Sequence, residues 1–231
     1  AYIEAGGNII ITGEPGKQSV LNPIVEKLGV AFAPGTLLQE SENYELNLIQ
    51  GKFTADAAAF GFDFYDKATV TFPGAVKLAF MDMGRYKVTP ILVTDEKVTW
   101  NKKGDFDLNT EKVVFDPSFE KKISAPIALA LQRVVNGKEQ KIMVLGDADF
   151  MSNGEINRNN INTVNASFAL RMFKWFSDGE YPVDTSRPKS IDDKVLLSRA
   201  DIGWMKVSTL GVVPLLIGMF GAVLLMIRRS K

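Results

Sequence analysis

The strongest hydrophobic pattern in the chain is a 21-residue run, residues 207–227, that carries no charged side chain. About 20 apolar residues suffice for a helix to cross the hydrocarbon core of a membrane. Trp204 and Lys206 precede the run, where interfacial anchors belong, and Arg228 and Arg229 follow it. We therefore predict one C-terminal transmembrane helix. The positive-inside rule places its basic end in the cytoplasm and the preceding residues outside.

Upstream of this run, the pattern alternates between strands and helices. Residues 8–12 form a β-branched run between glycines, and residues 19–28 carry apolar side chains at helical spacing. A strand, a glycine-containing turn and a helix form half of a βαβ unit. Residues 165–176 repeat apolar positions as an amphipathic helix does. The chain before the span is therefore predicted to fold as an α/β domain.

A β-hairpin is predicted around Asn136-Gly137, the strongest turn signal in the chain. Its arms lie near residues 124–135 and 140–146. Residues 68–80 and 88–94 predict further short strands.

Three segments follow from these patterns. They are an extracytoplasmic α/β domain over residues 1–178, a linker over 179–203 and a membrane-spanning segment over 204–231. Residues 2–8 read as the end of a helix leading into a strand, which predicts that a further N-terminal part precedes them.

Composition narrows the chemistry. The chain has no cysteine and no histidine, which removes disulfides, thiol nucleophiles and the Ser-His-Asp triad. The 27 basic and 27 acidic residues balance, so no basic surface favours nucleic acid as a partner. No cofactor is expected. A turn at residues 13–19 resembles a phosphate-binding loop, but Ile11 and Gln18 break the required pattern, so it is predicted to be a simple strand-to-helix turn.

Asp147 and Asp149 are the main candidates for a binding site. They follow a strand at positions i and i+2, and two carboxylates so spaced can share a hard cation. Asn153 lies nearby and completes the set of candidate ligand-binding residues. The alternative is structural and is favoured, because both carboxylates can accept hydrogen bonds from loop amides and cap the element that follows.

Six asparagines lie between residues 153 and 165, with Arg158 among them. Asparagine tolerates unusual backbone angles, so the segment is predicted to be a surface loop. A binding loop is the alternative, since loops often carry function.

Several stretches together resemble a known family. They are residues 2–11 (Tyr-Ile-Glu-Ala-Gly-Gly-Asn-Ile-Ile-Ile), 90–94 (Pro-Ile-Leu-Val-Thr) and 142–153 (Ile-Met-Val-Leu-Gly-Asp-Ala-Asp-Phe-Met-Ser-Asn), then the helix ending in Lys174-Trp175-Phe176 and the basic-tailed span. In this order they resemble the GldG-like family, auxiliary proteins of ABC-type transport systems that include a gliding-motility component. Residues 101–122 have no counterpart in this resemblance and read as an insertion or a long loop.

The resemblance implies a flavodoxin-like or class I amidotransferase-like sheet with helices on both faces. It implies that the catalytic residues of enzymes with that architecture are absent. It also implies an additional N-terminal half, further membrane spans, and an ABC permease and ATPase as partners. The expected location is the inner membrane of a bacterium, with the domain in the periplasm.

The leading hypothesis is therefore a non-catalytic, extracytoplasmic accessory subunit of an ABC-type transport complex, anchored in the lipid bilayer by its last helix. One alternative is a membrane-anchored enzyme that acts on carbohydrate or peptidoglycan through Asp147, Asp149 and Glu155. Another is a metal- or solute-binding module at the Asp147/Asp149 loop.

Overall fold

A computed structural model describes residues 1–104, 106–108, 110, 113–158, 160–181 and 199–229. The chain forms two units, an α/β domain within Ala1–Val183 and a helical unit within Asp184–Lys231. Most of the predicted linker, 179–203, lies outside the described residues. A helix already begins inside that segment, at Arg199.

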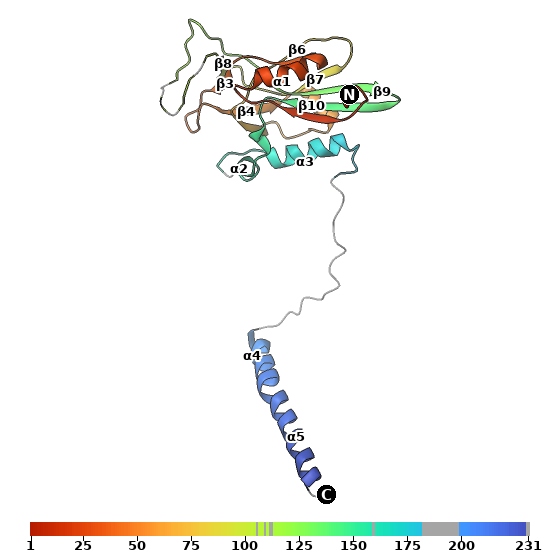
Figure 1. The fold of residues 1–231 in the computed structure, drawn as a ribbon. Helices are drawn as coiled ribbons and strands as arrows, with labels where there is room; N and C mark the ends of the chain where they lie inside the picture. Colours follow the sequence, from red (N-terminus) through yellow and green to blue (C-terminus); the bar gives the residue numbers. More distant parts are fainter. Residues whose placement is uncertain (105, 109, 111–112, 159, 182–198, 230–231) are drawn as a thin grey trace. The chain divides into compact units, whose positions relative to one another are not determined.

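The domain is built on a curled six-stranded sheet (Figure 1). In spatial order its strands are β1 Ile9–Thr12, β10 Lys138–Leu145, β9 Pro126–Val135, β7 Lys87–Val93, β4 Leu48–Phe53 and β5 Thr69–Pro73. β1 pairs with β10 in parallel, and the other four neighbouring pairs are antiparallel. The α/β class is confirmed. A flavodoxin-like sheet is built mostly from parallel strands, so that more specific prediction is not confirmed.

The predicted hairpin is confirmed as β9 and β10. Its two turn residues, Asn136 and Gly137, have φ angles of 52° and 77°. Positive φ at both positions is the requirement of a type I′ turn, which asparagine and glycine satisfy at little cost.

Two small antiparallel ribbons and several short helices complete the domain. The ribbons are β2 Val30–Phe32 with β6 Leu78–Phe80, and β3 Thr36–Gln39 with β8 Thr99–Lys102. The helices are α1 Gln18–Val25, α2 Asn153–Ile156, α3 Asn165–Phe176 and the 3₁₀ turns Glu26–Leu28, Ala55–Phe60 and Asp149–Met151. The predicted helices at 19–28 and 165–176 are therefore confirmed. Residues 2–6 form turns.

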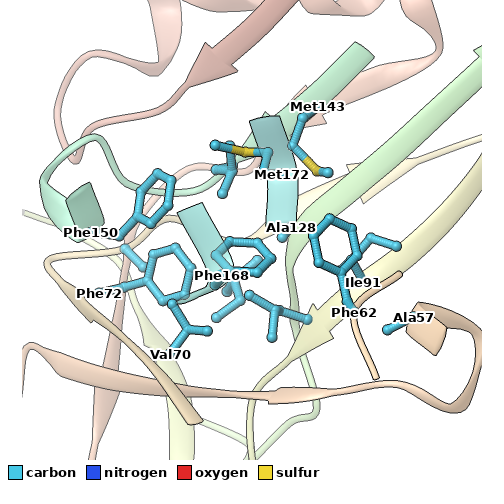
Figure 2. Close-up of a cluster of buried hydrophobic side chains, with 14 of the residues drawn as sticks. Ala57, Phe62, Val70, Phe72, Ile91, Ala128, Met143, Phe150, Phe168 and Met172 are labelled. Carbon is cyan, nitrogen blue, oxygen red and sulfur yellow. The ribbon is translucent and has the colours of Figure 1, made fainter. Parts of the chain in front are cut away.

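A hydrophobic cluster packs on each face of the sheet, and β9 and β10 contribute apolar side chains to both clusters. Alternate residues point to opposite faces of a strand. Met143 and Leu145 join the cluster under α3, whereas Ile142 and Val144 join the cluster under α1. Figure 2 shows the first cluster, in which Phe168 and Met172 of α3 meet side chains from several strands. The two longest helices of the domain therefore cover opposite faces of the sheet.

The C-terminal unit contains α4 Arg199–Val207, a π-helical segment Ser208–Val212 and α5 Val213–Arg229. Gly203–Arg229 is long and apolar enough to cross a membrane, and its most apolar stretch of 18 residues has a mean hydropathy of 2.6. The predicted span lies within it, Trp204 and Lys206 lie near its start, and Arg228 and Arg229 form its last turn. Pro214 follows the π-helical segment, where the wider turn accommodates a residue that lacks an N–H.

Candidate functional site

Glu14, Asp147 and Asp149 form an acidic cluster at one end of the main sheet. One carboxylate oxygen from each lies within 4.8 Å of those of the other two. The parallel register explains this meeting, because Thr12 pairs with Leu145 and both strands end at the same edge. Glu14 and Asp147 each lie two residues beyond that pair. The sequence predicted Asp147 and Asp149 but missed Glu14.

Gly146 holds the acidic turn close to the backbone of Val76. Its N–H donates to the Ile127 carbonyl and its carbonyl accepts from Val76 N–H, both at 2.8 Å. A Cβ atom on this residue would lie 2.2 Å from the Val76 carbonyl oxygen. Only glycine permits so close an approach. The backbone contact at Gly146 therefore fixes the position of Asp147, the next residue.

Asp147 is the buried member of the cluster, with 1% of its surface exposed. Its Oδ1 accepts a hydrogen bond from Asp149 N–H at 3.0 Å. Its Oδ2 is buried and has no hydrogen-bond partner among the described residues. Burial raises the pKa of Asp147 to about 7; the hydrogen bond from Asp149 opposes this shift, and the charges of Asp149 and Glu14 add to it.

Asp149 and Glu14 are exposed. Desolvation raises the pKa of Glu14, and the charge of Asp149 raises it further, against the lowering effect of Lys17. The cluster therefore joins one buried and two accessible carboxylates. The predicted structural role is confirmed in part, since Asp147 accepts a loop N–H. However, Ser152 caps the following helix by accepting from Glu155 N–H.

An open cleft of about 1120 Å³ lies beside the cluster, and Glu14 belongs to its lining. Among the described residues that line the cleft, Glu45 and Asp107 are also acidic, and none is lysine or arginine. Two of its polar side chains already bind backbone, since Gln18 donates to the Gly35 carbonyl and Asn22 bonds both N–H and C=O of Phe32. The charged side chains of the described lining are therefore acidic, which favours a neutral or cationic ligand over an anionic one.

Asn153 is exposed and begins α2. Its carbonyl accepts from Asn157 N–H and Nδ2. Among the described residues, no hydrogen bond joins its side chain to the acidic cluster. No described contact therefore supports the prediction that Asn153 binds a ligand together with the two aspartates.

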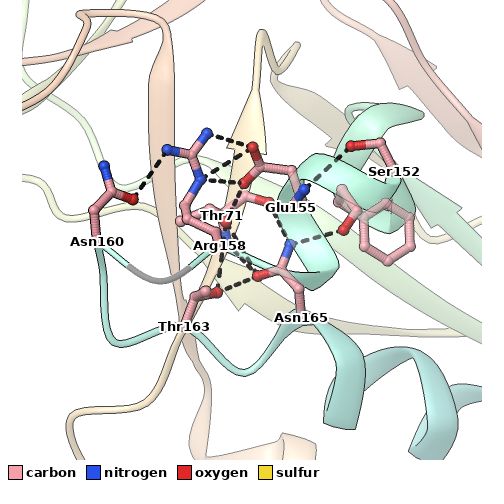
Figure 3. A network of polar contacts seen from close by, with 8 residues as sticks. Thr71, Ser152, Glu155, Arg158, Asn160, Thr163 and Asn165 are labelled. Atoms are coloured by element: carbon pink, nitrogen blue, oxygen red, sulfur yellow. Dashed lines mark hydrogen bonds and ion pairs between the residues drawn. The ribbon is translucent and has the colours of Figure 1, made fainter.

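Glu155 belongs to a separate polar network (Figure 3). Its Oε2 accepts from the Thr71 hydroxyl at 2.5 Å, and both its oxygens bond Arg158. Burial alone would raise the pKa of Glu155, but the hydrogen bonds from Arg158 and Thr71 outweigh it and lower the pKa. A paired, ionised carboxylate is poorly suited to donate a proton to a glycosidic oxygen.

Asn165 forms the centre of the same network and is buried. Its Oδ1 accepts from Thr71 N–H at 2.9 Å, while its Nδ2 donates to the carbonyls of Thr71 and Phe150 at 2.8 and 2.7 Å. The side-chain amide thus pairs with the free edge of β5 as a peptide group of another strand would. This last residue of the asparagine-rich segment has a structural function.

Comparison with known proteins shows similarity of fold. No protein-family model matches the sequence, and no curated protein matches it. Among solved structures, the chain is similar to the mmIFT52 N-terminal domain, with a TM-score of 0.53 and 16% sequence identity. The match covers 78% of this chain and 68% of that one. At this identity the likeness concerns the fold.

Proposed function

We propose that the chain is a membrane-tethered, non-catalytic accessory subunit of an ABC-type transport assembly, whose α/β domain recognises a ligand or partner. The observation that carries the proposal is the combination of a cleft-bearing domain with a helix long and apolar enough to span a membrane. We further propose that this is the inner membrane of a bacterium and that the domain lies in the periplasm. The sequence resemblance to the GldG-like family supports the transport assignment.

The charges around the cleft indicate what the domain recognises. Its lining carries Glu14, Glu45 and Asp107, and lacks a cation among the described residues. An anionic ligand would therefore meet repulsion unless a positive charge accompanied it. The preferred occupant is a neutral or positively charged group.

The carbohydrate-active alternative is less well supported. It required Asp147 and Glu155 to touch a sugar, but their exposed fractions are 1% and 3%. Glu155 is also held by Arg158, whose guanidinium occupies both carboxylate oxygens. A pair of glycosidase carboxylates must flank the scissile bond, which neither buried side chain can do without rearrangement.

Co-purification tests the accessory role. The tagged full chain is extracted from membranes in mild detergent, and the proteins eluted with it are identified by mass spectrometry. We expect an ABC permease and its ATPase to elute together with it. A chain ending at residue 181 serves as the comparison, and it should lose most of the association if the last helix holds the domain beside the permease. Recovery of the full chain alone would contradict the proposal.

The absence of cysteine allows a clean test of orientation. We expect Asp66→Cys, an exposed position in the domain, to react with a membrane-impermeant maleimide in spheroplasts. Ser230→Cys, in the basic tail, should react only after lysis, because the positive-inside rule places the tail in the cytoplasm. The unmodified chain gives the background. The opposite labelling pattern would show that the domain lies in the cytoplasm.

A further inference from the structure

We propose that Glu14, Asp147 and Asp149 form a binding site for a divalent cation of the calcium or magnesium type. This inference goes beyond the proposed function and does not depend on it, since a cation can bind whether or not the chain belongs to a transport assembly.

The chemistry of the cluster fits hard cations. Carboxylate oxygens are the ligands that calcium, magnesium and manganese prefer. Calcium–oxygen distances of about 2.3–2.6 Å place opposite ligands about 4.6–5.2 Å apart. The three carboxylate oxygens lie within 4.8 Å of one another, so all three can reach one calcium ion with little movement. Magnesium, with distances of about 2.0–2.1 Å, would draw the outermost oxygens slightly closer.

The buried carboxylate supplies an independent argument. Asp147 is 1% exposed, yet its Oδ2 has no hydrogen-bond partner among the described residues. A buried acceptor without a partner costs about 1–3 kcal/mol, and a charged one costs more. A bound cation would give this oxygen a partner. A role in the turn or in a helix cap would not explain why the oxygen is buried without one.

The surrounding charges point the same way. Among the described residues, none of the three carboxylates forms a salt bridge. Lys17 is near enough to lower the pKa of Glu14, but it makes no ion pair with it. Three carboxylates so close together repel one another, and a divalent cation would turn this repulsion into attraction.

The backbone prepares the site before any ion arrives. Glu14 follows β1, and Asp147 and Asp149 follow β10, so the parallel pair of strands fixes their approach. Gly146 adds a further constraint through its close contact with Val76. Three carboxylates leave several positions of a six- to eight-coordinate ion for water or for a ligand in the cleft that Glu14 lines.

Calorimetric titration of the full chain tests the site. The protein is treated with chelator, exchanged into detergent buffer without it, and titrated separately with calcium chloride and magnesium chloride. We expect saturable heat with a stoichiometry near one for at least one of the two ions. Glu14→Gln, Asp147→Asn and Asp149→Asn should each weaken the affinity by at least about tenfold. Asp56→Asn, an exposed acidic residue elsewhere in the domain, should bind as the unmodified chain does.

Two results would overturn the proposal. One is no saturable heat with either ion, and the other is binding that survives all three cluster substitutions. Thermal unfolding of each variant without added ions checks that it folds, so loss of binding is not mistaken for loss of structure. Co-purification with a permease and ATPase would be unaffected by either result, so failure of the cation site and failure of the accessory role remain distinguishable.

Discussion

The Asn165→Ala substitution is expected to lower the free energy of unfolding of the α/β domain by about 3–5 kcal/mol. It would leave three backbone groups without their partner, namely Thr71 N–H, Thr71 C=O and Phe150 C=O. Each buried polar group that loses its partner costs about 1–3 kcal/mol. Asn165 itself is 1% exposed, so water cannot readily replace the lost amide.

Urea denaturation of the full chain in detergent measures this effect. Tryptophan fluorescence reports unfolding of the domain, because Trp100 is buried in β8 and becomes exposed to water. Asn157→Ala is the matched control, because this exposed asparagine makes one local side-chain hydrogen bond to Asn153. It should change the stability by no more than about 0.5 kcal/mol. Equal effects of the two substitutions would show that the amide of Asn165 does not hold β5.

The Asp147→Asn substitution is expected to have the opposite sign and to stabilise the ion-free domain at pH 8 by about 2–4 kcal/mol. Burial raises the pKa of Asp147 from 3.8 to about 7, so the folded state retains the proton that the unfolded chain has already released. Stability therefore falls as the pH rises from about 4 to 7, and the full loss is present above pH 7. A pKa difference of this size corresponds to roughly 4 kcal/mol. Asparagine removes the charge and keeps an oxygen to accept from Asp149 N–H.

The pH dependence distinguishes this cause from better packing. The difference between Asp147→Asn and the unmodified chain, measured in urea with chelator present, should be large at pH 8 and close to zero at pH 4. Asp56→Asn should show no such trend, because Asp56 is exposed. A difference that is the same at both pH values would refute the argument. With calcium or magnesium added, the unmodified chain should gain more stability than the variant does.

Much of the domain could be predicted from the sequence, because its central elements have local signals. The Asn136-Gly137 turn predicts the β9–β10 hairpin, and the apolar spacing over 165–176 predicts α3. β3 and β4 lie in the irregular region between residues 36 and 65 and were not predicted. β3 pairs with β8, which is distant in sequence, and β4 lies between β5 and β7, so packing in the sheet rather than a local pattern determines their conformation.

The acidic cluster shows a different limit. Asp147 and Asp149 stand out as neighbours, but Glu14 lies more than a hundred residues away and joins them through the register of two parallel strands. Once β1 and β10 are paired, the position of Glu14 follows from counting. The sequence predicts each of the two strands, but it does not show that they pair with each other.

Asparagine has a structural role in this domain that the sequence did not predict. Asn8, Asn22 and Asn165 each use the side-chain amide to bond strand backbone, at Lys141, Phe32 and Thr71 respectively. An amide side chain has the same donor and acceptor as a peptide group, so it can form hydrogen bonds with the backbone of a strand where no neighbouring strand is present. Exposed strand edges invite association with other chains, and this pairing occupies part of them.

The parallel pairing of β1 with β10 also has a consequence for synthesis. Ile9 meets Ile142, so the sheet closes only after the ribosome has made most of the domain. Before contacts so distant in sequence can form, a long loop must close at a cost in entropy, and such contacts are typical of slower folding. The helix at Gly203–Arg229 is translated later still, so every strand of the sheet has been synthesised before the segment that would hold it in a bilayer.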